Sequence, residues 1–274
     1  MRHGRNEPGK RKFGSWILIL VLIAGVIYVI FATSAGEWLA ENVANPVFSV
    51  FSSSASPSPS SSVSSTSSQA VTDKVTIEEN TYYALQYGIF ADKDNAATAA
   101  SYIKARGGAG YLRTEDDKYR CIIATFKTKS DADAVKENLE SEDISTIVRE
   151  VKSEELSFNI TASETQTQSI KNSIEGVLSA ADKLIELSIK NDKGEDIKDD
   201  LDTLAEDLDT IYQDINSLTE NEGGEIAKIK SIVSTVKNTV DDLNENYTKP
   251  TTGYLAYAAT DTVYAVCDFI NSFS

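Results

Sequence analysis

The spacing of hydrophobic residues divides the chain into stretches of four kinds. An uninterrupted apolar run occupies residues 16–33, and a largely polar stretch follows it over 34–79. Short apolar runs bounded by turn residues extend over 80–152, whereas residues 160–273 repeat apolar positions at helical spacing. The first pattern is typical of a membrane span, the third of short strands and helices, and the last of packed helices.

The first stretch predicts a transmembrane helix. Ser15–Thr33 carries no charge, and at 1.5 Å per residue it spans about 28 Å, close to the thickness of a bilayer's hydrocarbon core. The basic tail of residues 1–15 places the N-terminus in the cytoplasm and the remaining domains outside, according to the positive-inside rule. We therefore expect a single-pass protein of the cell membrane. A cleaved signal peptide is the alternative, although its apolar core would span only about 7–15 residues.

Residues 34–79 are predicted to form a juxtamembrane segment and a linker. Ser49–Ser68 contains 13 serines, with Pro57 and Pro59 among them. Such a segment buries too little apolar surface to offset the entropy lost on ordering the chain. We expect it to separate the membrane from the folded domains.

Residues 80–152 predict a small α+β domain. Asp92 or Asp94 is placed to cap the first helix and Ser130 the second. The order βαββαβ indicates a ferredoxin-like sandwich, with both helices on one face of an antiparallel sheet. The expected elements are strand 82–90, helix 92–105, strand 109–114, strand 119–126, helix 130–141 and strand 144–151.

Residues 160–273 predict an all-α, up-down four-helix bundle. Breaks at Gly194, at Gly223-Gly224 and around Pro250 separate four helical patterns, and short turns make consecutive helices antiparallel. The last helix, Thr252–Phe273, is apolar on more than one side. The second helix shows the regularity of the seams through Ile197, Leu201, Leu204, Leu208, Ile211, Ile215 and Leu218.

Composition then removes several classes of function. The net charge is −16, and residues 154–274 contain nine lysines, no arginine and 24 acids, so a nucleic-acid partner is not expected. The single histidine, His3, lies in the basic tail, which excludes a Ser-His-Asp triad or a histidine-bound zinc in the folded part. Cys121 and Cys267 are too few for a disulfide framework, and whether they pair stays open. No metal and no cofactor are predicted, because the acidic residues lie between the apolar positions of helices, as on a solvated face.

Residues 80–152 resemble the SPOR (sporulation-related repeat) family. The resemblance rests on the strand YYALQYGIF at 82–90 and on the arginine-bearing strand YRCIIATF at 119–126, which occur in the family's order of elements. Family members begin with an aromatic–x–Val–Gln–x–Gly–x–Phe strand. This chain differs at Ile89, where many members carry a small hydroxyl residue, and at Ala124-Thr125, which stand in place of a Gly-Pro pair.

The resemblance implies binding of peptidoglycan, especially glycan strands stripped of their stem peptides, across the exposed face of the sheet. The amide of Gln86 offers donors and an acceptor to sugar hydroxyls and N-acetyl groups, and Arg120 adds donors. Tyr82 or Tyr119 is expected to stack on a pyranose, whereas Phe90 and Phe126 are expected in the core. The residues predicted to bind glycan are Gln86, Tyr119, Arg120, Tyr82 and Gly88.

The leading prediction is a non-enzymatic envelope protein, similar to membrane-anchored SPOR proteins of the stage II sporulation protein B type. It would bind peptidoglycan at septa in cell division or in sporulation and engulfment, and its acidic helices, 160–273, would contact division or engulfment proteins. A scaffold or sensor whose SPOR-like domain binds protein is one alternative. A wall hydrolase is another, but a zinc amidase needs histidines, and a lytic transglycosylase needs a deep cleft that tight helical seams do not offer. An RNA-recognition domain shares the strand order but needs basic surroundings.

Overall fold

The computed structural model describes residues 70–218, 224–247 and 252–273, which belong to one compact unit. The predicted membrane span and most of the predicted linker lie outside these residues. Within them, no helix combines the length and the apolar character needed to cross a bilayer.

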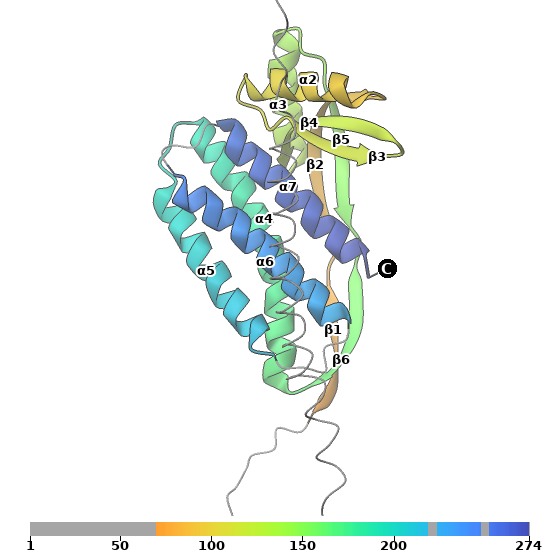
Figure 1. The fold of residues 1–274 in the computed structure, drawn as a ribbon, viewed down its shortest axis with the longest axis vertical. Helices are drawn as coiled ribbons and strands as arrows, with labels where there is room; N and C mark the ends of the chain where they lie inside the picture. Colours follow the sequence, from red (N-terminus) through yellow and green to blue (C-terminus); the bar gives the residue numbers. More distant parts are fainter. Residues whose placement is uncertain (1–69, 219–223, 248–251, 274) are drawn as a thin grey trace, which may run out of the picture. The chain divides into compact units, whose positions relative to one another are not determined.

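The elements of the predicted α+β domain occur in the expected order (Figure 1). Their strands form one antiparallel sheet with the order β3-β4-β2-β5. The elements are β2 Asn80–Phe90, α2 Lys93–Lys104, β3 Tyr111–Glu115, β4 Lys118–Phe126, α3 Lys129–Ser141 and β5 Ile147–Ser153.

Local side-chain contacts explain where the two helices begin. Asp92, one of the two predicted caps, accepts a hydrogen bond from the backbone nitrogen of Asn95 at 2.9 Å and starts α2. The prediction of Ser130 as the cap of α3 is wrong. Thr128 has an extended backbone, and its hydroxyl accepts from the backbone nitrogen of Asp131 at 3.1 Å, so Ser130 already lies in the first helical turn.

Helices α2 and α3 cover one face of the sheet, as predicted, and enclose a first core. Alternate side chains of β2 and β4 point into this core, because successive residues of a strand face opposite sides of the sheet. Its buried members are Leu85, Ala99, Ala100, Ile103, Cys121, Ile123, Phe126 and Ala132.

The C-terminal part forms four helices, joined by short connections, in which consecutive helices run in opposite directions (Figure 1). The first of them packs against the other three. The four helices are α4 Glu164–Asp192, α5 Lys198–Asn216, α6 Gly224–Glu245 and α7 Thr252–Asn271.

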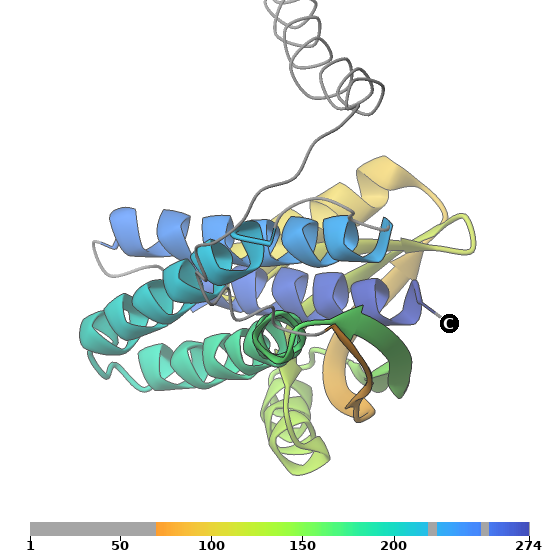
Figure 2. The same ribbon diagram turned by 90° about the horizontal axis from the view of Figure 1, so that it is seen from below.

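The second face of the sheet is not free, which corrects the expectation of an exposed binding face. Helix α7 contacts β3, β4 and β5 and packs on the face that they form (Figures 1 and 2). A second core therefore runs without a break from the sheet into the helices. The sheet contributes Tyr82, Ala84, Ile122 and Val151 to it, each at most 9% exposed.

Two further strands were not predicted. β1, Val71–Ile77, pairs antiparallel with β6, Leu156–Ala162, in a separate two-stranded sheet. The first lies within residues 34–79, which were predicted as a juxtamembrane segment and linker. Residues 71–77 form a strand, so the predicted end of the linker is wrong. Both runs alternate apolar and polar residues, with Val75, Ile77 and Leu156 buried. That alternation was the available signal, and the adjoining serine-rich composition obscured it.

Candidate functional site

The sheet face that meets α7 is covered along only part of its length. Cross-strand partners point to the same side of a sheet, and the register places Gln86 opposite Ile147 and Ile89 opposite Arg120. Ile89 and Ile147 are 46% and 60% exposed, so α7 leaves this end uncovered. We call this region the open end and define it as Gln86, Ile89, Glu115, Arg120, Ile147 and Arg149.

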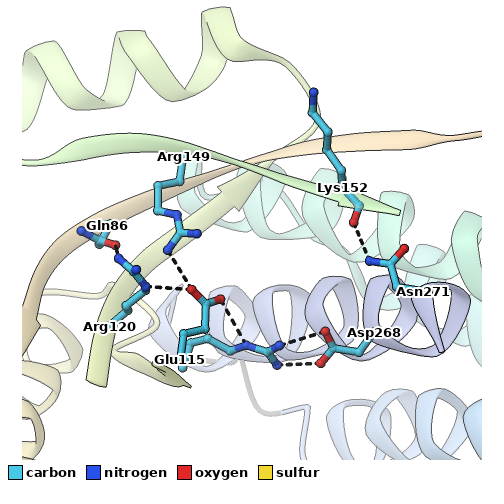
Figure 3. Close-up of polar contacts among 8 residues, drawn as sticks. Gln86, Glu115, Arg120, Arg149, Lys152, Asp268 and Asn271 are labelled. Carbon is cyan, nitrogen blue, oxygen red and sulfur yellow. Dashed lines mark hydrogen bonds and ion pairs between the residues drawn. The ribbon is translucent and has the colours of Figure 1, made fainter. Parts of the chain in front are cut away.

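A charged network occupies the open end, and Glu115 lies at its centre (Figure 3). The Oε2 atom of Glu115 accepts hydrogen bonds from Arg120 Nε at 2.8 Å and from Arg149 Nη1 at 3.0 Å. Arg113 Nε lies 3.5 Å from the other carboxylate oxygen. Burial alone would raise the pKa of Glu115, but the hydrogen bonds and charges of Arg149 and Arg120 outweigh it and hold this pKa below its usual value.

Arg113 connects this network to α7. Its two terminal nitrogens donate to the carboxylate of Asp268 at 2.6 and 2.8 Å, a bidentate pair that raises the pKa of Arg113 despite its partial burial. A second polar link lies further along β5, where Asn271 donates to the carbonyl oxygen of Lys152 at 3.0 Å (Figure 3). These contacts fix the last turns of α7 against β3 and β5.

Gln86 and Arg120, both predicted as glycan contacts, are brought together. The Oε1 atom of Gln86 accepts a hydrogen bond from Arg120 Nη1 at 3.2 Å. Gln86 is only 3% exposed, so it lies deeper than the predicted surface position. Among the described residues its amide nitrogen donates no hydrogen bond, and it is not one of the fully enclosed polar atoms without a partner. The amide therefore retains one unused donor group at the floor of the open end.

The other three predicted residues are not part of this arrangement. Tyr82 is 1% exposed and packs in the second core, with burial raising its pKa, so it offers no ring face to a ligand. Tyr119 precedes Arg120 and therefore points to the opposite side of the sheet, beside its cross-strand partner Phe90. A Cβ atom at Gly88 would come within 3.1 Å of the Phe90 ring, which gives this glycine a packing role. Whether any of these residues contacts glycan stays a prediction.

Sequence reasoning missed Glu115 and Arg149. Glu115 lies between the predicted strands 109–114 and 119–126, and Arg149 lies within the predicted strand 144–151, but neither was predicted to bind glycan. Their residue types held a signal, since the described residues contain four arginines among many lysines and three of the four converge here. Arginine is the residue that holds planar anionic or polar groups through several donors at once. Within the described ranges, no group of three or more His, Cys, Asp or Glu residues is placed to hold a metal ion.

Comparison with known proteins identifies the α+β part of the chain. Residues 79–150 match the family model of the SPOR domain, which confirms the resemblance drawn from the strand motifs. Among solved structures, the chain is similar to the solution structure of the peptidoglycan-binding domain of the B. subtilis cell-wall lytic enzyme CwlC. The two are 28% identical, and the match covers 26% of this chain and 90% of that one with a TM-score of 0.24. No curated protein matches the chain.

Proposed function

We propose that this protein binds the glycan strands of peptidoglycan at the open end of its SPOR domain and alters no covalent bond. The observation that carries the proposal is the array of Gln86, Arg120, Glu115 and Arg149, which lies within the segment that matches the SPOR family. Members of this family bind peptidoglycan, and the array offers the groups that a sugar polymer requires.

The chemistry of the open end suits a sugar. Pyranose rings present hydroxyl and N-acetyl groups, and these need both donors and acceptors, which the two guanidiniums, the Gln86 amide and the Glu115 carboxylate supply. The hydrogen bonds within the network hold its side chains in place before a ligand arrives, which lowers the entropic cost of binding. Ile89 and Ile147 provide exposed apolar surface for acetyl methyl groups or ring carbons.

The proposed setting is the outer side of the cell membrane. The predicted span at 16–33 would anchor the chain, and the serine-rich linker would let the SPOR domain reach the wall. Tethering confines the domain near its target, so a weak affinity for each glycan segment is sufficient. We place the protein at septa during cell division or during sporulation and engulfment, where denuded glycan is exposed. The acidic outer surfaces of the C-terminal helices would contact division or engulfment proteins.

Co-sedimentation of the purified chain with peptidoglycan sacculi tests the proposal. We expect stronger retention on sacculi pretreated with an amidase, which removes stem peptides, than on untreated sacculi. Arg120→Ala should weaken retention roughly tenfold, because hydrogen bonds to a charged group contribute about 1.5–3 kcal/mol. Arg106→Ala is the matched control, since Arg106 stacks on Tyr102 of α2, away from the open end, and should bind like the parent chain.

Three outcomes contradict the proposal. If the parent chain does not sediment with either preparation, the protein-binding scaffold becomes the better reading. If Arg120→Ala and Arg106→Ala are retained equally, while circular dichroism shows both folded, glycan binds elsewhere. Release of soluble wall fragments by the parent chain would instead point to a hydrolase.

A further inference from the structure

The network at the open end contains more positive than negative charge. Three guanidiniums share two carboxylates, so these five side chains carry a net charge of +1 in a strongly acidic chain. Asp268 is engaged by Arg113 through both of its oxygens. Among the described residues, Glu115 is the carboxylate that pairs with both Arg120 and Arg149. A partly buried surplus of guanidinium charge is favourable when an anion completes it.

Arg149 has the largest unused capacity for such an anion. Its Nη1 atom donates to Glu115, but within the described part of the chain its Nε and Nη2 atoms donate no hydrogen bond. Its side chain is 32% exposed, against 17% for Arg120, so Arg149 is the more accessible of the two to a ligand from solvent. Two adjacent N–H groups on one edge match the two oxygens of a carboxylate.

A second observation points to the same place. The hydroxyl of Tyr264, a residue of α7 that is 4% exposed, is enclosed and has no hydrogen-bond partner among the described residues. Burial raises the pKa of Tyr264 to about 12, and its hydroxyl lies within electrostatic range of Arg149, Glu115, Arg113 and Arg120. The Tyr264 ring lies beside Arg113, with 5.1 Å between the guanidinium carbon and the ring centroid, so the α7 side of the network holds an O–H donor without an acceptor among the described residues. An unsatisfied buried polar group of this kind calls for a water or a ligand atom.

Building on the proposed function, we propose that Arg149 binds the free lactyl carboxylate of muramic acid in the glycan. The lactyl group combines a methyl and a carboxylate, and Ile147 lies two residues before Arg149 on the same face of β5, so both parts meet a suitable partner. In intact peptidoglycan this carboxylate is bonded to the stem peptide as a neutral amide. Removal of the peptide would thus expose a negative charge, and the Arg149 guanidinium would bind it.

Calorimetric titration of the purified chain with four defined ligands measures their affinities and tests this assignment. The ligands are muramic-acid-containing oligosaccharides without stem peptides, the same oligosaccharides with their carboxylates converted to methylamides, free stem peptide, and N-acetylglucosamine oligomers. We expect the acidic oligosaccharide to bind at least tenfold more tightly than its methylamide, and the free peptide not to bind. Arg149→Gln should reduce that ratio to near one, whereas Arg106→Gln, which lies outside the open end, should keep the full ratio.

The outcomes separate this assignment from the proposed function. Equal affinity of the parent chain for the acidic and methylamide oligosaccharides overturns the carboxylate assignment but leaves glycan binding in place. Binding of the free stem peptide at the same site, lost in Arg149→Gln, overturns it as well, because the carboxylate would then belong to the peptide. Absence of binding to every saccharide removes the proposed function itself. Because the Arg149 side chain makes a single hydrogen bond to the described part of the chain, we expect Arg149→Gln to fold, and its melting curve checks this.

Discussion

One face of the four-stranded sheet is buried in one part and exposed to solvent in another. Ile122 of β4 is 0% exposed beneath the helical layer, whereas Ile147 of β5, on the same face, is 60% exposed. Both residues are cross-strand partners of Gln86, so they lie in one row across β4, β2 and β5. What differs is the cover, because α7 packs over one part of this face and leaves the open end uncovered. The comparison teaches that the surface of a small sheet becomes core or binding site according to what packs on it.

The cover over the closed part is structural. Ring contacts join Tyr111 of β3 to Tyr257 and Tyr264 of α7 at centroid distances of 5.4 and 5.5 Å. Tyr82, Ile122 and the helices share one hydrophobic core, so separating α7 from the sheet would expose apolar surface on both. We therefore expect the helical layer to stay in place when ligand binds. For the same reason, residues 73–153 cut out alone would present this apolar face to water.

The largest difference in stability is expected between two isoleucine-to-alanine substitutions, one in the covered part of the face and one at the open end. Ile122→Ala should lower the free energy of unfolding by about 3 kcal/mol, since it leaves a cavity between the sheet and the helices. Ile147→Ala should change it by less than about 0.5 kcal/mol, because the side chain is mostly in solvent. Urea unfolding followed by circular dichroism measures both. Equal losses in the two variants would show that the open end is buried in solution.

A smaller effect is expected at the ion pair between Arg113 and Asp268. Asp268→Asn removes the bidentate partner of Arg113 and should cost about 1 kcal/mol, reduced because the Asp268 side chain is 51% exposed. The loss should shrink at 1 M salt, where charges are screened. Glu175→Gln is the matched control, because its exposed pair with Lys171, at 3.7 Å, should contribute only about 0.3 kcal/mol. A salt-independent loss at Asp268 would indicate a packing defect in place of a lost ion pair.

The acid stability of the chain should reveal the charge at the open end. The pKa of Glu115 is lower in the folded state, so its contribution is present above the pKa of an unfolded glutamate and is lost as the pH falls through the folded value. Between about pH 5 and pH 3, Glu115→Gln should therefore lose stability with a shallower slope than the parent chain, by up to one proton. Unfolding midpoints at stepped pH values measure the slopes. Identical slopes would mean that Glu115 is not held by the arginines.

The smallest effect is expected for the two cysteines, which should not react with a thiol reagent in the folded chain. Cys121 and Cys267 are both free and buried, one on each side of the sheet, and burial raises the pKa of their thiols to about 11 and about 12. Both should resist a thiol reagent at neutral pH until the chain unfolds, since the thiolate is the reactive form. Mass spectrometry of trapped samples distinguishes the two positions. Selective labelling of Cys267 when glycan is added would show that α7 moves away from the sheet.

Much of this architecture was accessible from patterns along the chain. The motifs at 82–90 and 119–126 predicted the two central strands, and helical spacing predicted the four C-terminal helices. Within the site, the Gln86 and Arg120 positions came from the strand motif, and the structure joins them. Glu115 and Arg149 could not be assigned in this way, because their proximity depends on which strands are neighbours in the sheet.

The cap of α3 and the strand pair β1–β6 show a different limit. Ser130 and Thr128 are both suitable cap residues, and only the backbone conformation at Thr128 selects between them. The alternation in Val71–Ile77 is a strand signal, but a single strand gains stability only when a partner is found, here Leu156–Ala162, far along the chain.

Helix α7 shows which features the sequence determines and which depend on tertiary packing. A helix in a bundle needs one apolar stripe, and the apolar residues on further sides of this one already required a second buried contact. The amino-acid sequence therefore determined the strands, the helices and the need to bury an additional face. The sequence did not specify which surface would bury the additional face of α7, because hydrophobic burial is non-directional and any apolar face can provide it. Only the packing of α7 on the sheet decided which part of that face became core and which part stayed open to a ligand.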